Sequence, residues 1–203
     1  MFHMKQLDDL IHSAEVDLKT YLNLLNKWQK AVNLVADSTL SDAWNRHIID
    51  SAQIYTYIPK IAKILVDMGS GAGLPALVLA ILNQKNNGPL NQIILIESDT
   101  KKTLFLKEVV RTLHLPVQII NQRIEKVTDV KADVLTARAL TDLTGLLTLG
   151  RSFIQPETVC LFLKGKTVDS EIKQCPYHYA LEKIKSITNS NSYLVEITEV
   201  KYD

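Results

Sequence analysis

Hydrophobic positions in the first sixty residues repeat with the period of a helix. Apolar side chains recur every three or four residues over Leu7–Trp28, a spacing that predicts one long amphipathic helix with a single buried stripe. A second helical stretch is expected over residues 41–57, with Ser41 or Asp42 as its N-cap and Pro59 just beyond its end. Because no strand pattern occurs in this part of the chain, we interpret it as an N-terminal helical extension.

From residue 61 onward the pattern changes to short apolar runs that alternate with helical segments. A buried run of four or five residues between turn residues predicts a strand. Such runs occur at 64–67, 93–96, 117–120, 133–136 and 159–163, and two more strands are expected near 177–185 and 193–198. Strands that alternate with helices in this way indicate a doubly wound, mostly parallel α/β sheet. We predict one domain overall, in which the extension (residues 1–60) precedes the sheet (residues 61–203).

Length and composition fit a protein with its own hydrophobic core. The chain has 203 residues, of which 46% are hydrophobic, and needs no disulfide or metal to stabilise such a core. The longest apolar run, Leu74–Leu82, is far shorter than the roughly 18 to 20 residues of a membrane span, and no secretory signal is visible. Cys160 and Cys175 are isolated, so no disulfide framework or zinc site is expected. We predict a cytoplasmic protein with no metal and no membrane partner.

The net charge of +1 by itself argues against a nucleic-acid partner, but its distribution does not. Residues 61–165 carry a net charge of +3, whereas residues 1–60 and 166–203 carry −1 each. Ordinary surface variation explains so small a difference equally well. A protein that holds one structured RNA loop needs only a few placed cations, and the low total predicts modest affinity for arbitrary RNA.

A glycine-rich loop follows the first predicted strand. Gly69, Gly71 and Gly73 occupy every second position and let the backbone turn sharply close to a ligand. The dinucleotide fingerprint G-x-G-x-x-G requires a glycine at position 74, which is Leu74 here. Asp67, just before the loop, would repel a pyrophosphate, whereas a cationic sulfonium group tolerates an acidic neighbour. The loop therefore favours S-adenosyl-L-methionine over NAD, and a dinucleotide enzyme or a purely structural turn are the alternatives.

Short blocks elsewhere in the chain make this interpretation more specific. In sequence order they are Asn26–Leu34, Arg46–Ser51, Asp67–Pro75, Glu97–Ser98, Lys101–Lys102 with Phe105–Leu106, Arg123–Glu125, Ala137–Ala139 and Leu163–Gly165. In this combination and order the chain resembles the bacterial small-subunit ribosomal RNA guanine-N7 methyltransferases, also known as glucose-inhibited division protein B. The resemblance covers about residues 20–165.

The resemblance implies a fold, a cofactor and a substrate. The implied fold is a Rossmann-like class I methyltransferase with a seven-stranded, mostly parallel sheet whose last strand is antiparallel. The implied methyl donor is S-adenosyl-L-methionine, and the implied acceptor is N7 of a guanine in the decoding-region loop of 16S rRNA. The partner is therefore 16S rRNA or the small ribosomal subunit, and we expect the enzyme to act as a monomer.

Candidate cofactor contacts come from the resemblance and from the residues at the strand ends. The resemblance carries over Gly69, Leu74, Ile124, Glu125 and Arg138. The glycine loop and the end of the second strand add Asp67, Gly71, Gly73, Glu97 and Ser98. Of these, Glu97 is placed to accept hydrogen bonds from ribose hydroxyls. The chain departs from the family pattern at Ala76, which replaces a glycine, at Glu97, which replaces a commoner aspartate, and at residues 192–198, which lack basic side chains.

Guanine N7 carries a lone pair and no proton, so methyl transfer to it requires no general base. We expect catalysis by in-line positioning, which supplies on the order of 7–11 kcal/mol, and by management of the charge that moves onto the purine. Asn33, His47 and Asp50 are candidates for holding the base, and Asp50 has the acceptor for guanine N1–H and N2–H. The plainer interpretations are a turn residue for Asn33, a satisfied imidazole for His47, and an i,i+4 ion pair of Asp50 with Arg46.

Basic residues near the carboxyl ends of the predicted strands are candidates for phosphate contacts. They are Lys101, Lys102, Arg123 and Lys164, and Arg46 of the predicted helical stretch 41–57 is a further candidate. For Lys101 and Lys102, a solvated first helical turn is an equally good interpretation. Arg138 and Lys164 directly follow buried strands, so we also place them in the catalytic set. The target base in a structured loop has to be exposed or flipped out.

The sequence alone leaves several alternative functions. The rivals are a methyltransferase that acts on another RNA, on a small molecule or on a protein, and a non-catalytic rRNA-binding assembly factor that kept the fold. A dinucleotide oxidoreductase is disfavoured by Leu74 and Asp67. Binding of S-adenosylhomocysteine without binding of NAD separates a methyltransferase from the oxidoreductase.

Overall fold

The N-terminal extension consists of one long helix and a series of short helical turns. The computed structural model describes residues 2–202, and helix α1 spans Phe2–Gln29. Of its predicted stripe, Leu10, Leu22 and Trp28 are partly buried, and the other six residues are buried, namely Leu7, Ile11, Ala14, Leu18, Tyr21 and Leu25. The second stretch consists of a 3-10 helix (Asp37–Asp42), a π-helix (Trp44–Ile49), helix α2 (Asp50–Ala52) and a further 3-10 helix (Gln53–Tyr57).

The prediction of one helix that begins at an N-cap Ser41 or Asp42 is wrong. The 3-10 helix runs directly into the π-helix, and Ala43 at the junction donates its N–H to Leu40 O, so the junction needs no side-chain cap. Asp42 Oδ1 instead accepts a hydrogen bond from Asn45 Nδ2 at 2.7 Å. Within the described residues, the extension is otherwise helical and free of strands, as predicted.

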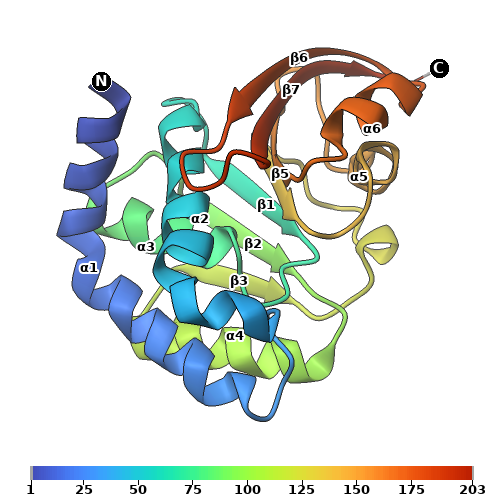
Figure 1. Ribbon diagram of the computed structural model, residues 1–203. Coiled ribbons are helices and arrows are strands. Elements are labelled where there is room, and N and C mark those ends of the chain that lie inside the picture. The colour runs from blue at the N-terminus through green and yellow to red at the C-terminus, as the bar shows by residue number, and fades with distance from the viewer. Residues whose placement is uncertain (1, 203) are drawn as a thin grey trace.

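The predicted sheet is present with its seven strands. They are β1 (Ile64–Met68), β2 (Gln92–Ile96), β3 (Val117–Ile120), β4 (Val134–Arg138), β5 (Val159–Lys164), β6 (His178–Lys185) and β7 (Tyr193–Lys201). Their order is β3-β2-β1-β4-β5-β7-β6, and β7 is antiparallel to both of its neighbours whereas the other pairs are parallel (Figure 1). The strand order reverses between β1 and β4. In sheets of this kind, ligands bind outside the carboxyl ends of the strands at that point.

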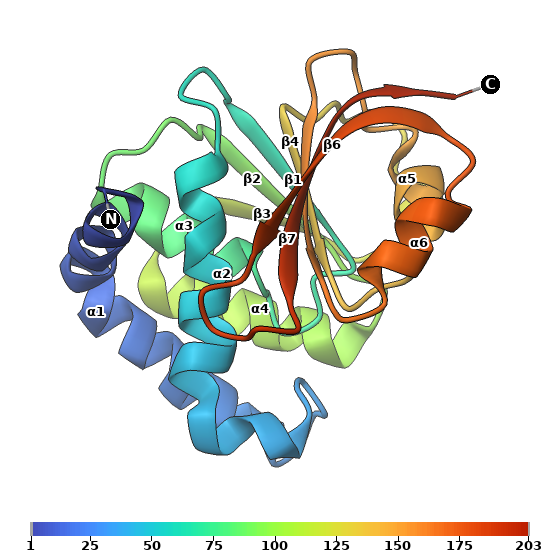
Figure 2. The same cartoon turned by 45° about the horizontal axis from the view of Figure 1, so that its top comes forward.

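Helices cover both faces of the sheet (Figures 1 and 2). Helices α3 (Ala76–Lys85) and α4 (Thr100–Leu113) lie with the N-terminal helices over one face, and α5 (Leu143–Gly150) and α6 (Val168–Gln174) lie over the other. One hydrophobic cluster joins α1, α3 and α4. The extension therefore shares its core with the sheet. Helices α5 and α6 are not predicted by the sequence pattern, because with eight and seven residues each makes only about two turns.

Three further features concern membranes, metals and thiols. Within residues 2–202, no helix is both long and apolar enough to cross a membrane. In the same range, no three His, Cys, Asp or Glu side chains gather as the ligands of a metal ion would. Cys160 and Cys175 are free thiols, and burial raises the pKa of Cys160 to about 12. Cys160 therefore behaves as a small apolar side chain of the core.

Candidate functional site

The glycine loop leaves the carboxyl end of β1 in a left-handed backbone conformation. Gly69, Gly71 and Gly73 have φ angles of +65°, +55° and +81°, which residues with a side chain rarely adopt. A Cβ atom at Gly73 would lie 2.3 Å from Leu77 Cδ1, so the loop also packs closely against α3. A hydrogen bond from Gly73 N to Ser70 O at 2.6 Å closes the loop. The loop therefore requires glycine for its shape as well as for close approach to a ligand.

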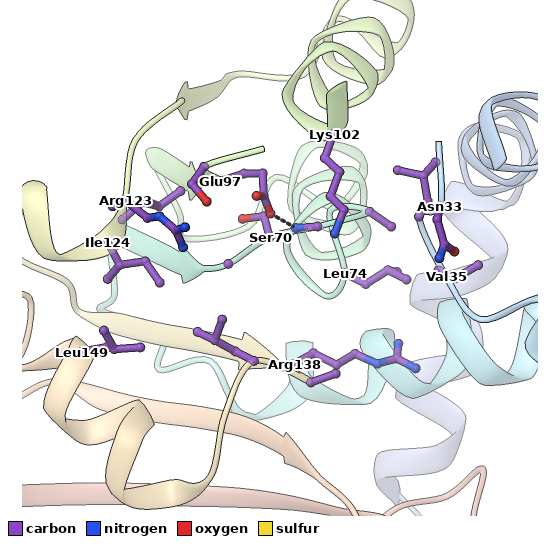
Figure 3. A pocket seen from close by; sticks show the side chains of 18 of the residues that line it. Asn33, Val35, Ser70, Leu74, Glu97, Lys102, Arg123, Ile124, Arg138 and Leu149 are labelled. Carbon is purple, nitrogen blue, oxygen red and sulfur yellow. Dashed lines mark hydrogen bonds between the residues drawn. The ribbon is translucent and has the colours of Figure 1, made fainter. Parts of the chain in front are cut away.

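A cavity of about 700 Å³ opens where the glycine loop meets the carboxyl ends of β2 and β4 (Figure 3). Most of the predicted site residues line it, namely Asn33, His47, Gly69, Gly71, Leu74, Glu97, Ser98, Lys102, Arg123, Ile124, Glu125 and Arg138. Figure 3 shows Ile124 and Leu149 on one side of the cavity and Leu74 and Val35 on the other. Its volume is in the usual range for a site that holds a cofactor-sized molecule. We call it the first cavity.

Glu97 connects the end of β2 to the glycine loop. Its side chain is buried, Oε2 accepts a hydrogen bond from Gly71 N at 2.8 Å, and Oε1 accepts one from Asp99 N at 2.7 Å. The two bonds fix the orientation of the carboxylate in the wall of the first cavity. Each oxygen keeps a lone pair for a further donor, so Glu97 is a preorganised acceptor for hydroxyl groups of a ligand.

Asp67 lies inside the sheet and not in the wall of the first cavity. It is fully buried, Thr136 Oγ1 donates to its Oδ1 at 2.6 Å, and Oδ2 has no hydrogen-bond partner among the described residues. Burial raises the pKa of this carboxyl group to about 7. The expectation that a charged Asp67 faces the ligand is therefore corrected. The lining of the cavity also does not include Gly73 or Lys101.

Tyr21 of α1 contacts the glycine loop, which the sequence pattern does not reveal. Its side chain is fully buried, and its hydroxyl donates to Ala72 O at 2.8 Å. Burial raises the pKa of Tyr21, so the hydroxyl remains a donor at neutral pH. The helical spacing identifies Tyr21 only as a member of the buried stripe. The N-terminal extension therefore supports the glycine loop directly.

A second cavity, of about 280 Å³, adjoins the first. Arg138 and Ala139, at the end of β4, line both cavities. The second cavity also contains Arg46, Asp50 and Lys164 of the predicted set, and Thr188, Asn189 and Ser192 of the β6–β7 turn, which were not predicted. Ala139 has a φ of +52°, so the chain turns sharply at the edge that the two cavities share.

Arg138 is held through only one of its two terminal nitrogen atoms. Nη2 donates to Arg46 O at 2.7 Å and lies 3.5 Å from Asp50 Oδ2. Nη1 is buried and has no partner among the described residues. Burial lowers the pKa of the guanidinium group and Asp50 opposes this shift, so Arg138 stays charged. The ion-pair partner of Asp50 is thus Arg138, and the i,i+4 pair with Arg46 is not formed.

His47, on the π-helix of the extension, is a buried, uncharged imidazole in the wall of the first cavity. Its Nε2 lies 2.9 Å from Thr39 Oγ1, and its Nδ1 lies 3.4 Å from Arg138 Nη2. Burial, followed by the positive charges of Arg138 and Arg46, lowers the pKa of His47 to about 4. At neutral pH the ring therefore adds no positive charge to the site.

The side chains predicted to contact phosphates differ in where they point and in whether they are paired. The Lys164 side chain is 8% exposed, its Nζ lies 2.6 Å from Glu171 Oε2, and it donates to Thr141 O at 2.8 Å. It therefore holds the end of β5 to neighbouring segments and does not extend toward a phosphate, contrary to expectation. The Lys102 side chain instead points from α4 into the first cavity, and Arg123 is exposed at its edge (Figure 3).

A family model and curated relatives with the same description match most of this chain. A family model described as rRNA small subunit methyltransferase G (GidB) matches residues 14–194. The chain is similar to the ribosomal RNA small subunit methyltransferase G of Rhodospirillum centenum, with 42% identity over 90% of this chain and 83% of the relative. It is similar to that of Paramagnetospirillum magneticum, with 40% identity over 90% of this chain and 87% of the relative. A solved SAM-dependent methyltransferase from Aquifex aeolicus has 12% identity, a TM-score of 0.60 and coverage of 78% of this chain and 93% of its own. This structural similarity shows the class I methyltransferase fold, as predicted.

Proposed function

The chain belongs to the rRNA small subunit methyltransferase G family, and from this premise we propose that it transfers a methyl group from S-adenosyl-L-methionine to N7 of guanine 527 of 16S rRNA. The observation that carries the proposal is the pair of adjoining cavities at the carboxyl ends of the strands, which share Arg138 and Ala139. The larger cavity suits the donor, and the smaller one suits a single flipped base. The shared edge is where a methyl group would pass from one to the other.

The residues of the first cavity fit S-adenosylmethionine. The glycine loop permits close approach of a ligand to the backbone, Glu97 accepts hydrogen bonds from ribose hydroxyls, and Ile124 with Leu149 flanks the adenine ring. The free donor Nη1 of Arg138 matches the carboxylate of the methionine group. When bound, the cofactor supplies an electrophilic methyl group on a positively charged sulfur.

The second cavity receives the guanine. Asp50 Oδ1 already accepts hydrogen bonds from Gln53, Ser186 and Thr188, so Oδ2, next to Arg138, is the oxygen that accepts from the N1–H and N2–H groups of the base. This orientation turns N7, on the opposite side of the purine, away from Asp50 and toward the first cavity.

The proposed methyl transfer requires no general base. N7 attacks with its lone pair, and no proton leaves that atom. His47 is neutral and the charge of Arg138 is balanced by Asp50, so neither of these two groups places an unbalanced positive charge beside the purine as it becomes positive. Exposed Asn33, in the wall of the first cavity, orients the base from the other side. Because this reaction needs no Lewis acid, the proposal includes no metal.

RNA is held around the two cavities by cations, of which Arg46 and Arg123 are exposed and Lys102 is half-buried. Arg46 lines the second cavity, and Lys102 and Arg123 line the first, so the three side chains surround the place where a flipped base would enter. We further propose that the enzyme acts as a monomer in the cytoplasm, where ribosomal subunits are assembled. Residues 1–60 and 61–203 form one folding unit in this proposal, because they share a hydrophobic core.

The proposal is tested by mapping 7-methylguanine. Unmethylated small subunits and free 16S rRNA are incubated with the protein and labelled S-adenosylmethionine, and the RNA is then cleaved with borohydride and aniline. We expect one new break, at guanine 527. Arg138→Gln is expected to abolish it, whereas the matched control Lys126→Gln, an exposed cation outside both cavities, is expected to leave it unchanged.

Two outcomes contradict the proposal in different ways. If the protein binds S-adenosylhomocysteine but gives no break in 16S rRNA, the substrate is wrong. If the folded protein binds neither S-adenosylhomocysteine nor S-adenosylmethionine in calorimetry, the enzyme class is wrong and a non-catalytic assembly factor is favoured.

A further inference from the structure

The turn between β6 and β7 lies against the N-terminal extension. Figures 1 and 2 both show this turn beside α2. Ser186 Oγ and Thr188 Oγ1 each lie 3.0 Å from Asp50 Oδ1, at sequence separations of 136 and 138 residues. Asp50 and Ser186 are 8% and 7% exposed, so water competes little for these hydrogen bonds.

Gln53 fixes the same turn through both ends of its amide group. Its Nε2 lies within hydrogen-bond distance of Asp50 Oδ1 (3.0 Å) and of Ser186 Oγ (3.2 Å), and its Oε1 accepts from Ile187 N at 3.2 Å. Thr188 N donates to Ser186 Oγ, also at 3.2 Å. The turn is therefore held by its backbone as well as by side chains. Ser186 Oγ and Thr188 Oγ1 also lie 3.0 Å from each other, and both are within hydrogen-bond distance of Asp50 Oδ1.

The consequence concerns the orientation of the Asp50 carboxylate. A carboxylate oxygen has about two lone-pair sites, and Oδ1 faces three donors, so its accepting capacity is used up. Oδ2 is the oxygen that remains, 3.5 Å from Arg138 Nη2, and both Asp50 and Thr188 line the second cavity. Rotation of the carboxylate would break the bonds to Gln53, Ser186 and Thr188. The hydroxyls of the turn thus select the oxygen that Asp50 presents to a ligand.

We propose that Ser186 and Thr188 are positioning residues for the methyl acceptor, acting through Asp50 to hold the guanine at the angle that in-line transfer to N7 requires. This inference rests on the proposed function. RNA affinity comes largely from phosphate contacts, so a loosened base affects the rate of transfer more than the binding of the RNA. The expected signature is a lower kcat with little change in KM for the RNA.

Steady-state methylation of small subunits tests this role. Thr188→Val keeps the shape of the side chain and loses its hydroxyl, and we expect kcat to fall roughly fivefold, the equivalent of one hydrogen bond. KM for the RNA and the Kd for S-adenosylhomocysteine are expected to stay within about twofold, and Thr188→Ser is expected to restore the rate. Ser186→Ala carries the same expectation as Thr188→Val, and Thr198→Val, on β7 of the same hairpin, is the matched control with an unchanged rate.

A double-mutant cycle separates positioning through Asp50 from a purely structural role. Thr188→Val is expected to lower kcat in the wild-type background and to have no further effect in the Asp50→Ala background. An equal loss in both backgrounds overturns the inference, as does an unchanged kcat in Thr188→Val and Ser186→Ala proteins that melt like the wild type. If the wild-type protein itself does not methylate the RNA, the proposed function fails, which is a different result from the failure of the positioning role alone.

Discussion

The buried carboxyl group of Asp67 makes the stability of this fold depend on pH in a specific direction. Burial raises its pKa from 3.8 to about 7, and the hydrogen bond from Thr136 Oγ1 offsets the rise only in part. Between pH 3.8 and about 7, the Asp67 carboxyl group is therefore protonated in the folded state and ionised in the unfolded state. Linkage then requires the contribution of Asp67 to the free energy of unfolding to fall as the pH rises from about 4 to about 7, and to stay constant above that.

The size of the effect follows from the shift of about 3 pH units. Each unit corresponds to about 1.4 kcal/mol, so ionised Asp67 costs the folded state on the order of 4 kcal/mol at pH 8. Asp67→Asn removes the titration and keeps the shape of the side chain. We expect the stability of Asp67→Asn, relative to the wild type, to increase by about 1.4 kcal/mol per pH unit between about pH 5 and 7 and to level off above pH 7.

Urea unfolding at a series of pH values, followed by the fluorescence of Trp28 and Trp44, measures this difference, because both indole rings pack against the core. The exposed Asp129→Asn is the matched control for the removal of a carboxylate. The reasoning is refuted if the difference in the free energy of unfolding between Asp67→Asn and the wild type is constant between about pH 5 and 7, or shrinks as the pH rises. In that case Asp67 is ionised in the folded protein.

Three further outcomes concern the site. Tyr21→Phe removes the 2.8 Å hydrogen bond to the glycine loop and is expected to weaken S-adenosylhomocysteine binding, measured by calorimetry, roughly fivefold. The control Tyr202→Phe loses a 2.8 Å hydrogen bond to Leu147 O and is expected to leave the affinity unchanged. Gly73 has a φ of +81°, and a Cβ atom at this position would lie 2.3 Å from a leucine side chain. We therefore expect Gly73→Ala to lower the free energy of unfolding, measured in urea, by about 2 kcal/mol or more. Gly165→Ala, whose added Cβ atom meets nothing within 4 Å, is expected to change it by less than about 0.5 kcal/mol. Because the pKa of His47 is lowered to about 4, the single-turnover rate is expected to be flat from about pH 6 to 8.5, and a tenfold rise per pH unit would instead indicate proton removal by the enzyme.

The parts of the fold that depend on local pattern are those that the sequence predicts well. Strands β1, β2, β4 and β5 are mostly buried runs between turn residues, and the glycine loop has three glycines at every second position after the first of them, so neighbouring residues define both. The π-helix at Trp44–Ile49 is different. Its apolar spacing is that of any helix, and its hydrogen-bond pattern depends on how the segment packs against the rest of the chain. Periodicity therefore identifies the segment as helical but not the type of helix.

The same distinction separates the two sides of the candidate site. The cofactor side is built from loops at the ends of consecutive strands, so the motif gives most of its lining. On the acceptor side, sequence spacing pairs Asp50 with Arg46, one helical turn away, whereas the folded chain pairs it with Arg138 and with hydroxyls of a turn more than 130 residues later. Within the sequence, the turn at 186–192 is an ordinary polar turn. The acceptor side therefore depends on three distant segments meeting at one carboxylate, and variation in the β6–β7 turn is expected to change the use of the acceptor while binding of the cofactor stays the same.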